Sequence, residues 1–179
     1  MGGEILPSYQ STVFTSSYPA GTQYHQDFLL CANTTHATYM LNAYAFSTGY
    51  TGSTLSKAKV ASNGMGYAFQ VTKVMANITS GSLTANITVE IAQRGIAPFY
   101  YPLSLILMCS NGTELYTRSG LETALINAGE TVNFTVSIAN SYLCLNNISI
   151  SLSSSRLVQG QAIKFAQGTT GVVTVSIPV

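Results

Sequence analysis

The residues that could do chemistry in this chain are six carboxylates, two histidines and three cysteines. A glycoside hydrolase needs two carboxyl groups about 5–10 Å apart in a cleft. Residue alternation places Glu90 on the polar side of a strand, and the later glutamates fall in or near turns. We therefore expect solvated surface groups and predict no enzymatic activity for the carboxylates, which are Glu4, Asp27, Glu90, Glu114, Glu122 and Glu130.

One group of residues has the composition of a metal site, namely His25, Asp27 and His36. Its spacing matches no common zinc motif, and calcium would need more converging oxygen ligands than this chain offers. Helix capping and ordinary polar contacts are the favoured roles. The chain also carries no nucleophile-elbow, Walker or dinucleotide-binding motif, so no cofactor and no metal are predicted.

The cysteines suggest an oxidising compartment. Cys109 ends an apolar run, and Cys144 lies inside a second strand-like segment. Two strand cysteines at this separation suit a disulfide between neighbouring strands. Cys31 would then be left over, either free and buried or paired to another chain.

Six N-x-[ST] sequences occur, and proline blocks none of them. A chain rich in serine, threonine and asparagine produces some of these by chance, but six exceed that expectation. The pattern predicts a secreted or cell-surface protein that carries covalent N-glycans. The predicted acceptors are Asn33, Asn77, Asn86, Asn111, Asn133 and Asn147.

Charge is scarce, because only 7% of the residues are charged against a usual ~25%. Seven scattered cations cannot form a basic patch, so nucleic acids and acidic membranes are poor partners. No apolar segment approaches the ~20 residues of a membrane span. The opening MGGEILPSYQ lacks the features of a signal peptide, so we expect a removed leader or a longer chain.

The elements that hold these residues divide the chain near residue 62. Residues 1–62 are predicted to form a polar arm and short helices at 24–33 and 36–46. A third helix is predicted with Ser53 or Thr54 as its N-terminal cap and with Lys57 and Lys59 near its end.

Residues 63–179 alternate with the period of a β-strand. In SLTANITVEIA, for example, every second residue is apolar and Asn86 lies on the polar side. About seven short strands separated by turn residues predict a mainly β chain with an antiparallel β-sandwich, immunoglobulin-like or jelly-roll-like.

The segment EIAQRGIAPFYYPLSLILMCSNGT at 90–113 predicts two strands joined at a kink, where Gly95 and Pro98 interrupt the pairing. Leu103, Leu105, Leu107 and Cys109 should line one face. The aromatics Phe99, Tyr100 and Tyr101 are possible sugar-stacking residues, although packing at the end of the core is the favoured role.

Five segments are similar to a known family in their order along the chain. They are NTTHATYMLNAYAF (33–46), GMGYAFQV (64–71), RGIAPFYYPLSLIL (94–107), AGETVNFTV (128–136) and IKFAQGTTG (163–171). The pattern resembles the C-terminal domain of unknown function that follows a TIM-barrel-like domain in secreted, glycosidase-like proteins. The resemblance implies a β-sandwich and places any activity in the barrel, which is absent from this sequence. Gln93 departs from the family, which tends to have asparagine there.

Together these features predict a non-catalytic extracellular structural or interaction protein. The segment TVFTSSY (12–18) could add as a strand to another molecule and so drive self-assembly by β-strand addition. The alternative is an accessory carbohydrate-binding module of a glycoside-hydrolase-like protein.

Overall fold

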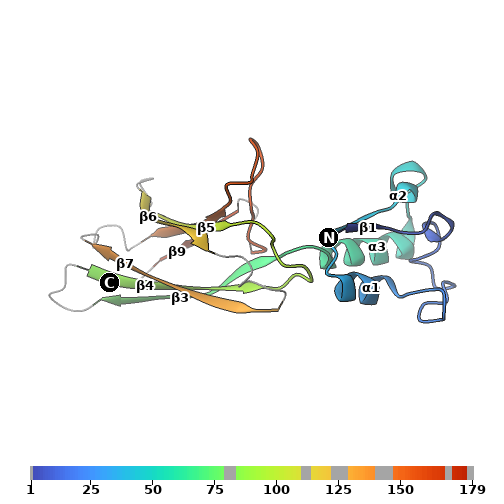
Figure 1. Ribbon diagram of the computed structural model, residues 1–179, viewed down its shortest axis with the longest axis horizontal. Helices are drawn as coiled ribbons and strands as arrows, with labels where there is room; N and C mark the ends of the chain where they lie inside the picture. The colour runs from blue at the N-terminus through green and yellow to red at the C-terminus, as the bar shows by residue number, and fades with distance from the viewer. Residues whose placement is uncertain are drawn as a thin grey trace. The chain divides into compact units, whose positions relative to one another are not determined.

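The computed structural model describes residues 2–78, 84–109, 114–121, 129–139, 147–167 and 171–176. The chain divides into two compact units, and each is described by itself (Figure 1). The first comprises Met1–Tyr67 together with Gly95–Pro98, and the second Ala68–Arg94 and Phe99–Val179. The predicted division at residue 62 falls inside a helix of the first unit.

The first unit contains the helices. A two-stranded parallel sheet pairs β1 (Gly2–Glu4) with β2 (Tyr39–Leu41). The helical elements are the 3-10 helix η1 (Pro7–Tyr9), α1 (Phe28–Thr35), α2 (Ala43–Ser47) and α3 (Gly52–Gly64). Their core contains Ile5, Phe28, Ala32, Ala37 and Ala61.

Three expectations for this unit need correction. The helix predicted at 36–46 is wrong in its first half, because His36 adopts a left-handed conformation that ends α1 and residues 39–41 pair with β1. The third helix starts at Gly52 after Thr51, and no side chain caps it. Residues 11–18 form turns and bends rather than a strand.

The segment Gly95–Pro98 belongs to the first unit because backbone hydrogen bonds hold it there. The N–H of Ala97 donates to the carbonyl of Gly66 at 2.9 Å, and the N–H of Gly66 donates to Ala37 at 3.1 Å. Gly66 has a φ of 77°, a conformation that favours glycine. Ile96 packs against the helical core.

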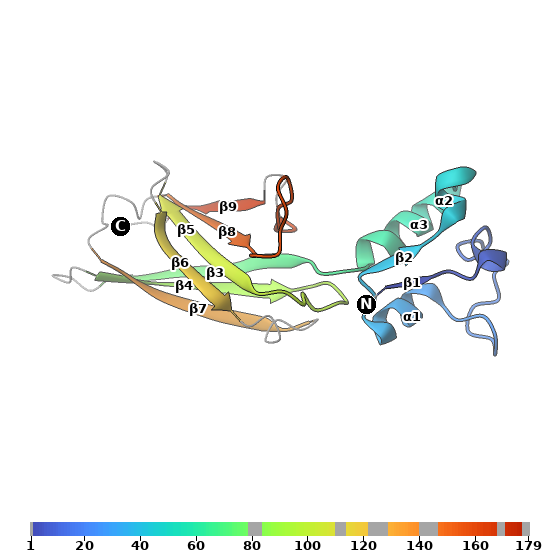
Figure 2. The same cartoon turned by 45° about the horizontal axis from the view of Figure 1, so that its top comes forward.

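The second unit contains two antiparallel sheets (Figures 1 and 2). One has the order β3-β4-β7 and the other the order β6-β5-β8-β9. The strands are β3 (Phe69–Ile78), β4 (Thr84–Gln93), β5 (Leu103–Cys109), β6 (Glu114–Leu121), β7 (Thr131–Ala139), β8 (Ile148–Ser153) and β9 (Val172–Val175). The prediction of a mainly β chain is confirmed.

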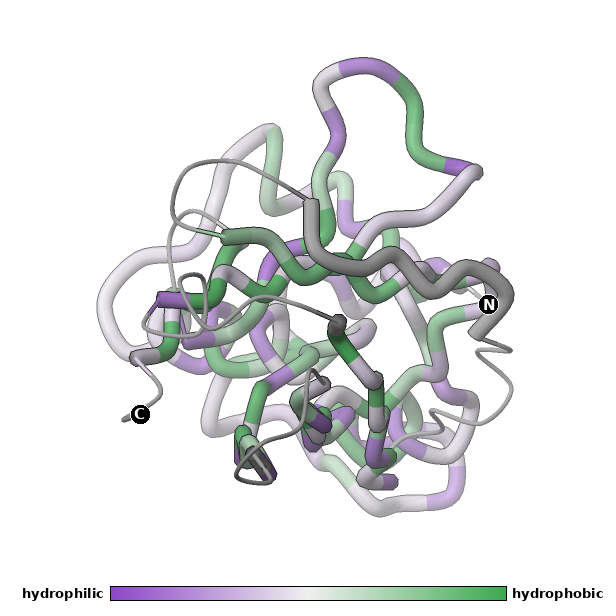
Figure 3. Tube along the Cα trace, turned by 90° about the vertical axis from the view of Figure 1, so that its left-hand side faces the viewer, coloured by the Kyte–Doolittle hydropathy of each residue, from purple (hydrophilic) through white to green (hydrophobic). Residues whose placement is uncertain are grey.

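The alternation seen in the sequence defines the core of this unit. In β4 the side chains of Ala85, Ile87, Val89 and Ile91 are buried, and Thr84 and Asn86 are exposed. In β5 the predicted face of Leu103, Leu105, Leu107 and Cys109 is buried as well. Hydrophobic and hydrophilic residues are interspersed along the trace (Figure 3). Both sheets contribute to one hydrophobic cluster, as expected for strands with period 2.

Candidate binding site

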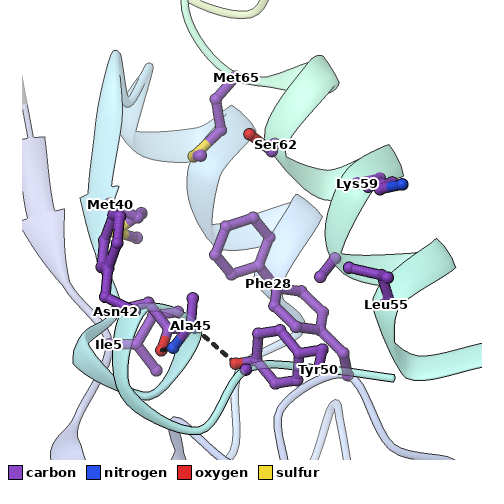
Figure 4. A pocket seen from close by; sticks show the side chains of 14 residues that line it. Ile5, Phe28, Met40, Asn42, Ala45, Tyr50, Leu55, Lys59, Ser62 and Met65 are labelled. Atoms are coloured by element: carbon purple, nitrogen blue, oxygen red, sulfur yellow. Dashed lines mark hydrogen bonds between the residues drawn. The ribbon is translucent and has the colours of Figure 1, made fainter. Parts of the chain in front are cut away.

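A pocket of about 370 Å³ lies in the first unit (Figure 4). Leu55, Lys59 and Ser62 come from α3, where spacings of four and three residues put them on one side of the helix. Phe28 reaches the pocket from the first turn of α1, and Met40 from β2. The other lining residues are Ile5, Phe14, Asn42, Ala45, Phe46, Gly49, Tyr50, Ala58 and Met65.

Aromatic contacts fix the inner wall of this pocket. The ring of Phe14 lies 5.1 Å from that of Phe28 and 5.3 Å from that of Tyr50, both edge to face. Phe14 and Phe28 also line a second pocket of about 550 Å³, together with Val60 and Asp27. The two rings are thus shared by both hollows, in an arrangement that aromatic pairs prefer.

A polar network closes one end of the first pocket. Asn42 Oδ1 accepts from the N–H of Ala45 and caps α2, and Asn42 Nδ2 donates to the hydroxyl of Tyr50 (Figure 4). That hydroxyl in turn donates to the carbonyl of Gln10. The side chain of Gln10 is itself buried and donates to the carbonyl of Ile5 at 2.9 Å. The side chains of Gln10, Asn42 and Tyr50 therefore all have hydrogen-bond partners within the protein.

One titratable side chain of this pocket has a shifted pKa. Burial raises the pKa of Tyr50, and the hydrogen bond from Asn42 opposes part of that rise. Tyr50 is thus a neutral phenol near pH 7. Lys59 is exposed. The mostly apolar lining can hold an apolar group, with the phenol and amide of the network at one end.

Sequence reasoning did not find this pocket. Asn42 just before AYAF is a recognisable helix cap. Gln10 and Tyr50, however, meet across 40 residues of chain, and no local pattern announces such a contact.

The residues of the metal-like group have other contacts. Asp27 caps α1 by accepting from the N–H of Leu30 at 2.9 Å. The ring of His25 contacts the rings of Tyr9 and Tyr18 in tilted and edge-to-face arrangements, with ring centroids 4.8 and 5.6 Å away. His36 Nδ1 lies 2.8 Å from the carbonyl oxygen of Ile96. Within the described ranges, no cluster of three potential metal ligands occurs.

The sequon asparagines in the described part of the chain are all exposed. Asn33 lies on α1 and Asn147 just before β8. Asn77, Asn86 and Asn133 lie on β3, β4 and β7 of one sheet, on the face opposite the core. Asn111 falls outside the described residues. Modification of these asparagines stays a prediction.

The aromatic block divides between core and surface. Phe99 is buried, with its ring edge-on to Phe69 and Tyr101, so it is not available for stacking on a sugar. Tyr100 and Tyr101 are 56% and 53% exposed. These two side chains alone remain candidates from the predicted sugar-stacking group.

Two of the three cysteines lie in the described part of the chain. Cys31 on α1 is a free thiol, and Cys109 at the end of β5 is buried. Cys144 lies outside the described residues, so the pairing of Cys109 with Cys144 stays a prediction. Among the described helices, none has both the length and the apolar character needed to cross a membrane.

No family model matches the chain, and no curated protein matches it. Among solved structures, it is similar to β-glucosidase 3B from Thermotoga neapolitana in complex with glucose, with 13% identity and a TM-score of 0.34 over 62% of this chain and 16% of that one. A GH3 β-glucosidase from Bifidobacterium adolescentis gives 13% identity and a TM-score of 0.33, covering 62% and 17% of the two chains.

The C-terminal domain of wzt gives 15% identity and a TM-score of 0.28, covering 50% and 58%. The chain thus spans about a sixth of the glucosidases' length. These scores are too low to support an argument about function.

Proposed function

We propose that this chain is a non-catalytic, N-glycosylated extracellular structural or interaction protein. The observation that carries the proposal is the exposure of every described sequon asparagine. A sugar can be attached and retained only where the asparagine side chain reaches solvent. Three of these asparagines share the outer face of the β3-β4-β7 sheet, so sugars there would leave the core undisturbed.

The surface gives a reason for sugars to be present. Charged side chains, which normally keep proteins soluble, are only 7% of this chain. Large apolar side chains are also exposed, including Phe46 at 90%, Tyr24 at 76% and Leu30 at 64%. Hydrated glycans would replace charge as the solvating layer in a secreted or cell-surface setting.

We also propose that the two sheets of the second unit form an antiparallel β-sandwich of immunoglobulin-like or jelly-roll-like type. The shared cluster supports it, because Ile87 and Val89 of β4 belong to the same core as Leu105 of β5 and Ile150 of β8. Sheets that pack face to face bury one side of each strand in this manner.

Mass spectrometry of intact glycopeptides from the native protein tests glycosylation. We expect sugar on Asn33, Asn77, Asn86, Asn133 and Asn147. Asn63, which is exposed but lacks a sequon, is the internal control and should be unmodified. Unmodified peptides at all of the sequons would refute the proposal.

A second candidate function is an accessory carbohydrate-binding module of a glycoside-hydrolase-like protein. The half-exposed Tyr100 and Tyr101 favour it, because sugars stack on accessible aromatic rings. Calorimetry with soluble glucans should then show binding that Tyr100→Ala and Tyr101→Ala weaken. Tyr67→Ala, at a residue 40% exposed in the other unit, is the matched control. Equal binding by all three variants would argue against this candidate.

The interaction role includes self-association by β-strand addition. The segment 12–18 is not a free strand, since it forms turns and Phe14 packs against Phe28. The second unit offers a different surface for the same kind of pairing, which is a strand at the edge of a sheet.

A further inference from the structure

The strand β3 lies at the edge of its sheet, and part of that edge is already covered. Phe165 forms a parallel bridge with Phe69, and the N–H of Ala166 donates to the carbonyl of Phe69 at 2.8 Å. The N–H of Val71 then donates to Oε1 of Gln167, and Nε2 of Gln167 donates to the carbonyl of Val71. The chain thus adds its own short segment to the first three residues of β3.

The remainder of β3 continues past this covered part. A β-bulge between Val71 and Lys73 shifts the register by one residue. Strand alternation then directs the backbone groups of Val74 and Ala76 towards the open edge. Within the described ranges, no hydrogen bond from another segment reaches these backbone groups.

This open edge has few of the features that prevent strands from pairing. Natural proteins protect an edge with charges, proline or repeated bulges. Residues 74–78 read VMANI, without a charge, proline or glycine. Val74 and Ala76 are only half-buried against the core, and Met75 on the outer face is 43% exposed. An added strand would bury more of all three.

We propose that the open edge of β3 pairs antiparallel with β3 of a second copy of this chain, around a two-fold axis at Met75. The inference rests on the self-association in the proposed function. In this register outward-directed residues pair with each other: Val74 lies opposite Ala76 of the other copy, and Met75 lies opposite itself. The product is a continuous six-stranded sheet.

The chemistry of the edge suits a second copy. In this register Lys73 faces Asn77 of the other copy, so no like charges oppose each other. Glu90, the cross-strand neighbour of Lys73, supplies a carboxylate on the same face. Asn77 projects from the face of the sheet rather than from its edge, so a sugar there leaves the backbone groups of the edge open.

Cysteine cross-linking tests this register in the full chain, produced without glycans in an oxidising bacterial compartment. Both variants carry Cys31→Ser to remove the free thiol. Met75→Cys places two thiols across a non-hydrogen-bonded pair, with Cα atoms about 4.5 Å apart. Lys73→Cys, on the same face, separates them by four residues or roughly 13 Å, beyond the ~7 Å limit for a disulfide.

We expect a disulfide-linked dimer from Met75→Cys and its loss in Lys73→Cys, both judged by non-reducing electrophoresis. Equal cross-linking of both variants, or of neither, would overturn the proposal. Sedimentation of Met75→Lys and Met75→Gln gives a second measure. The lysine should raise the dimer dissociation constant by up to about fivefold through like-charge repulsion at the axis, and the glutamine should leave the dimer intact. A monomeric parent chain would also refute pairing with a second copy, and the absence of glycans keeps this result separate from the glycosylation test.

Discussion

Gln93 offers the sharpest test of how the second unit is held together. Its side chain is fully buried, and Oε1 accepts from the N–H of Ala68 at 2.7 Å. Its own N–H donates to the carbonyl of Glu130, and its carbonyl accepts from Gly129, both at 2.9 Å. One residue thus joins the entry to β3, the end of β4 and the approach to β7.

The substitution Gln93→Met keeps the length of the side chain and removes its amide, both the acceptor oxygen and the NH2 donor. The backbone contacts of residue 93 can persist, so the loss is that of the side-chain amide, including its bond to Ala68. Leaving a buried partner unsatisfied costs about 1–3 kcal/mol. Because Ala68 is half-buried, water can replace part of the bond, and we expect the lower half of that range.

Urea unfolding followed by circular dichroism measures the effect. In thermal unfolding of a chain of this size, a loss of about 1 kcal/mol in stability corresponds to a fall in Tm of roughly 2–4 °C. Gln70→Met makes the same chemical change at a half-buried position on β3 and should cost less. If the free energy of unfolding of Gln93→Met lies within about 0.5 kcal/mol of that of the parent chain, the reasoning about this network is refuted.

Three further outcomes are expected. Phe165→Ala should destabilise the second unit by about 3–5 kcal/mol, because the side chain of Phe165 is only 2% exposed and lies beside β3. Val158→Ala, at a residue that is 64% exposed, should change the stability little. Thermal unfolding measures both variants, and equal losses of stability would contradict the packing of Phe165. Burial raises the pKa of Tyr50. The contribution of the neutral Tyr50 phenol to stability should therefore be fully present below pH ~10 and be lost as pH rises through the folded-state pKa. When unfolding is measured at increasing pH, the free energy of unfolding should fall less in Tyr50→Phe than in the parent chain. Part of the fall should remain in this variant, because burial also raises the pKa of Tyr18. Identical pH profiles for the two chains would argue against a contribution from Tyr50. Thiol titration of the unfolded, unreduced chain should give one reactive cysteine, Cys31, and three after reduction; three before reduction would exclude the pairing of Cys109 with Cys144.

Local patterns in the sequence predicted much of the second unit. The alternation in β4 and β5 identified the buried residues correctly, because side chains on a strand point to opposite faces whatever surrounds them. The outward position of Asn86 followed from the same rule. The capping role of Asp27 was also within reach, since it depends on residues three positions apart.

Contacts between distant parts of the chain decided the rest. Residues 39–41 became a strand through pairing with β1, against a local helical pattern. Gly95–Pro98 joined the helical unit through bonds to Gly66 and His36, and the pocket network brought Gln10 to Tyr50.

The sequence by itself determined which residues alternate, which are charged and which asparagines lie in sequons. Only the tertiary structure decided that Phe99 is core while Tyr100 and Tyr101 face solvent, and that Gln167 covers one part of the β3 edge and not the next. The physical reason is that periodicity acts between neighbouring residues. Burial and edge pairing depend on segments that are close in space and as much as 96 residues apart along the chain.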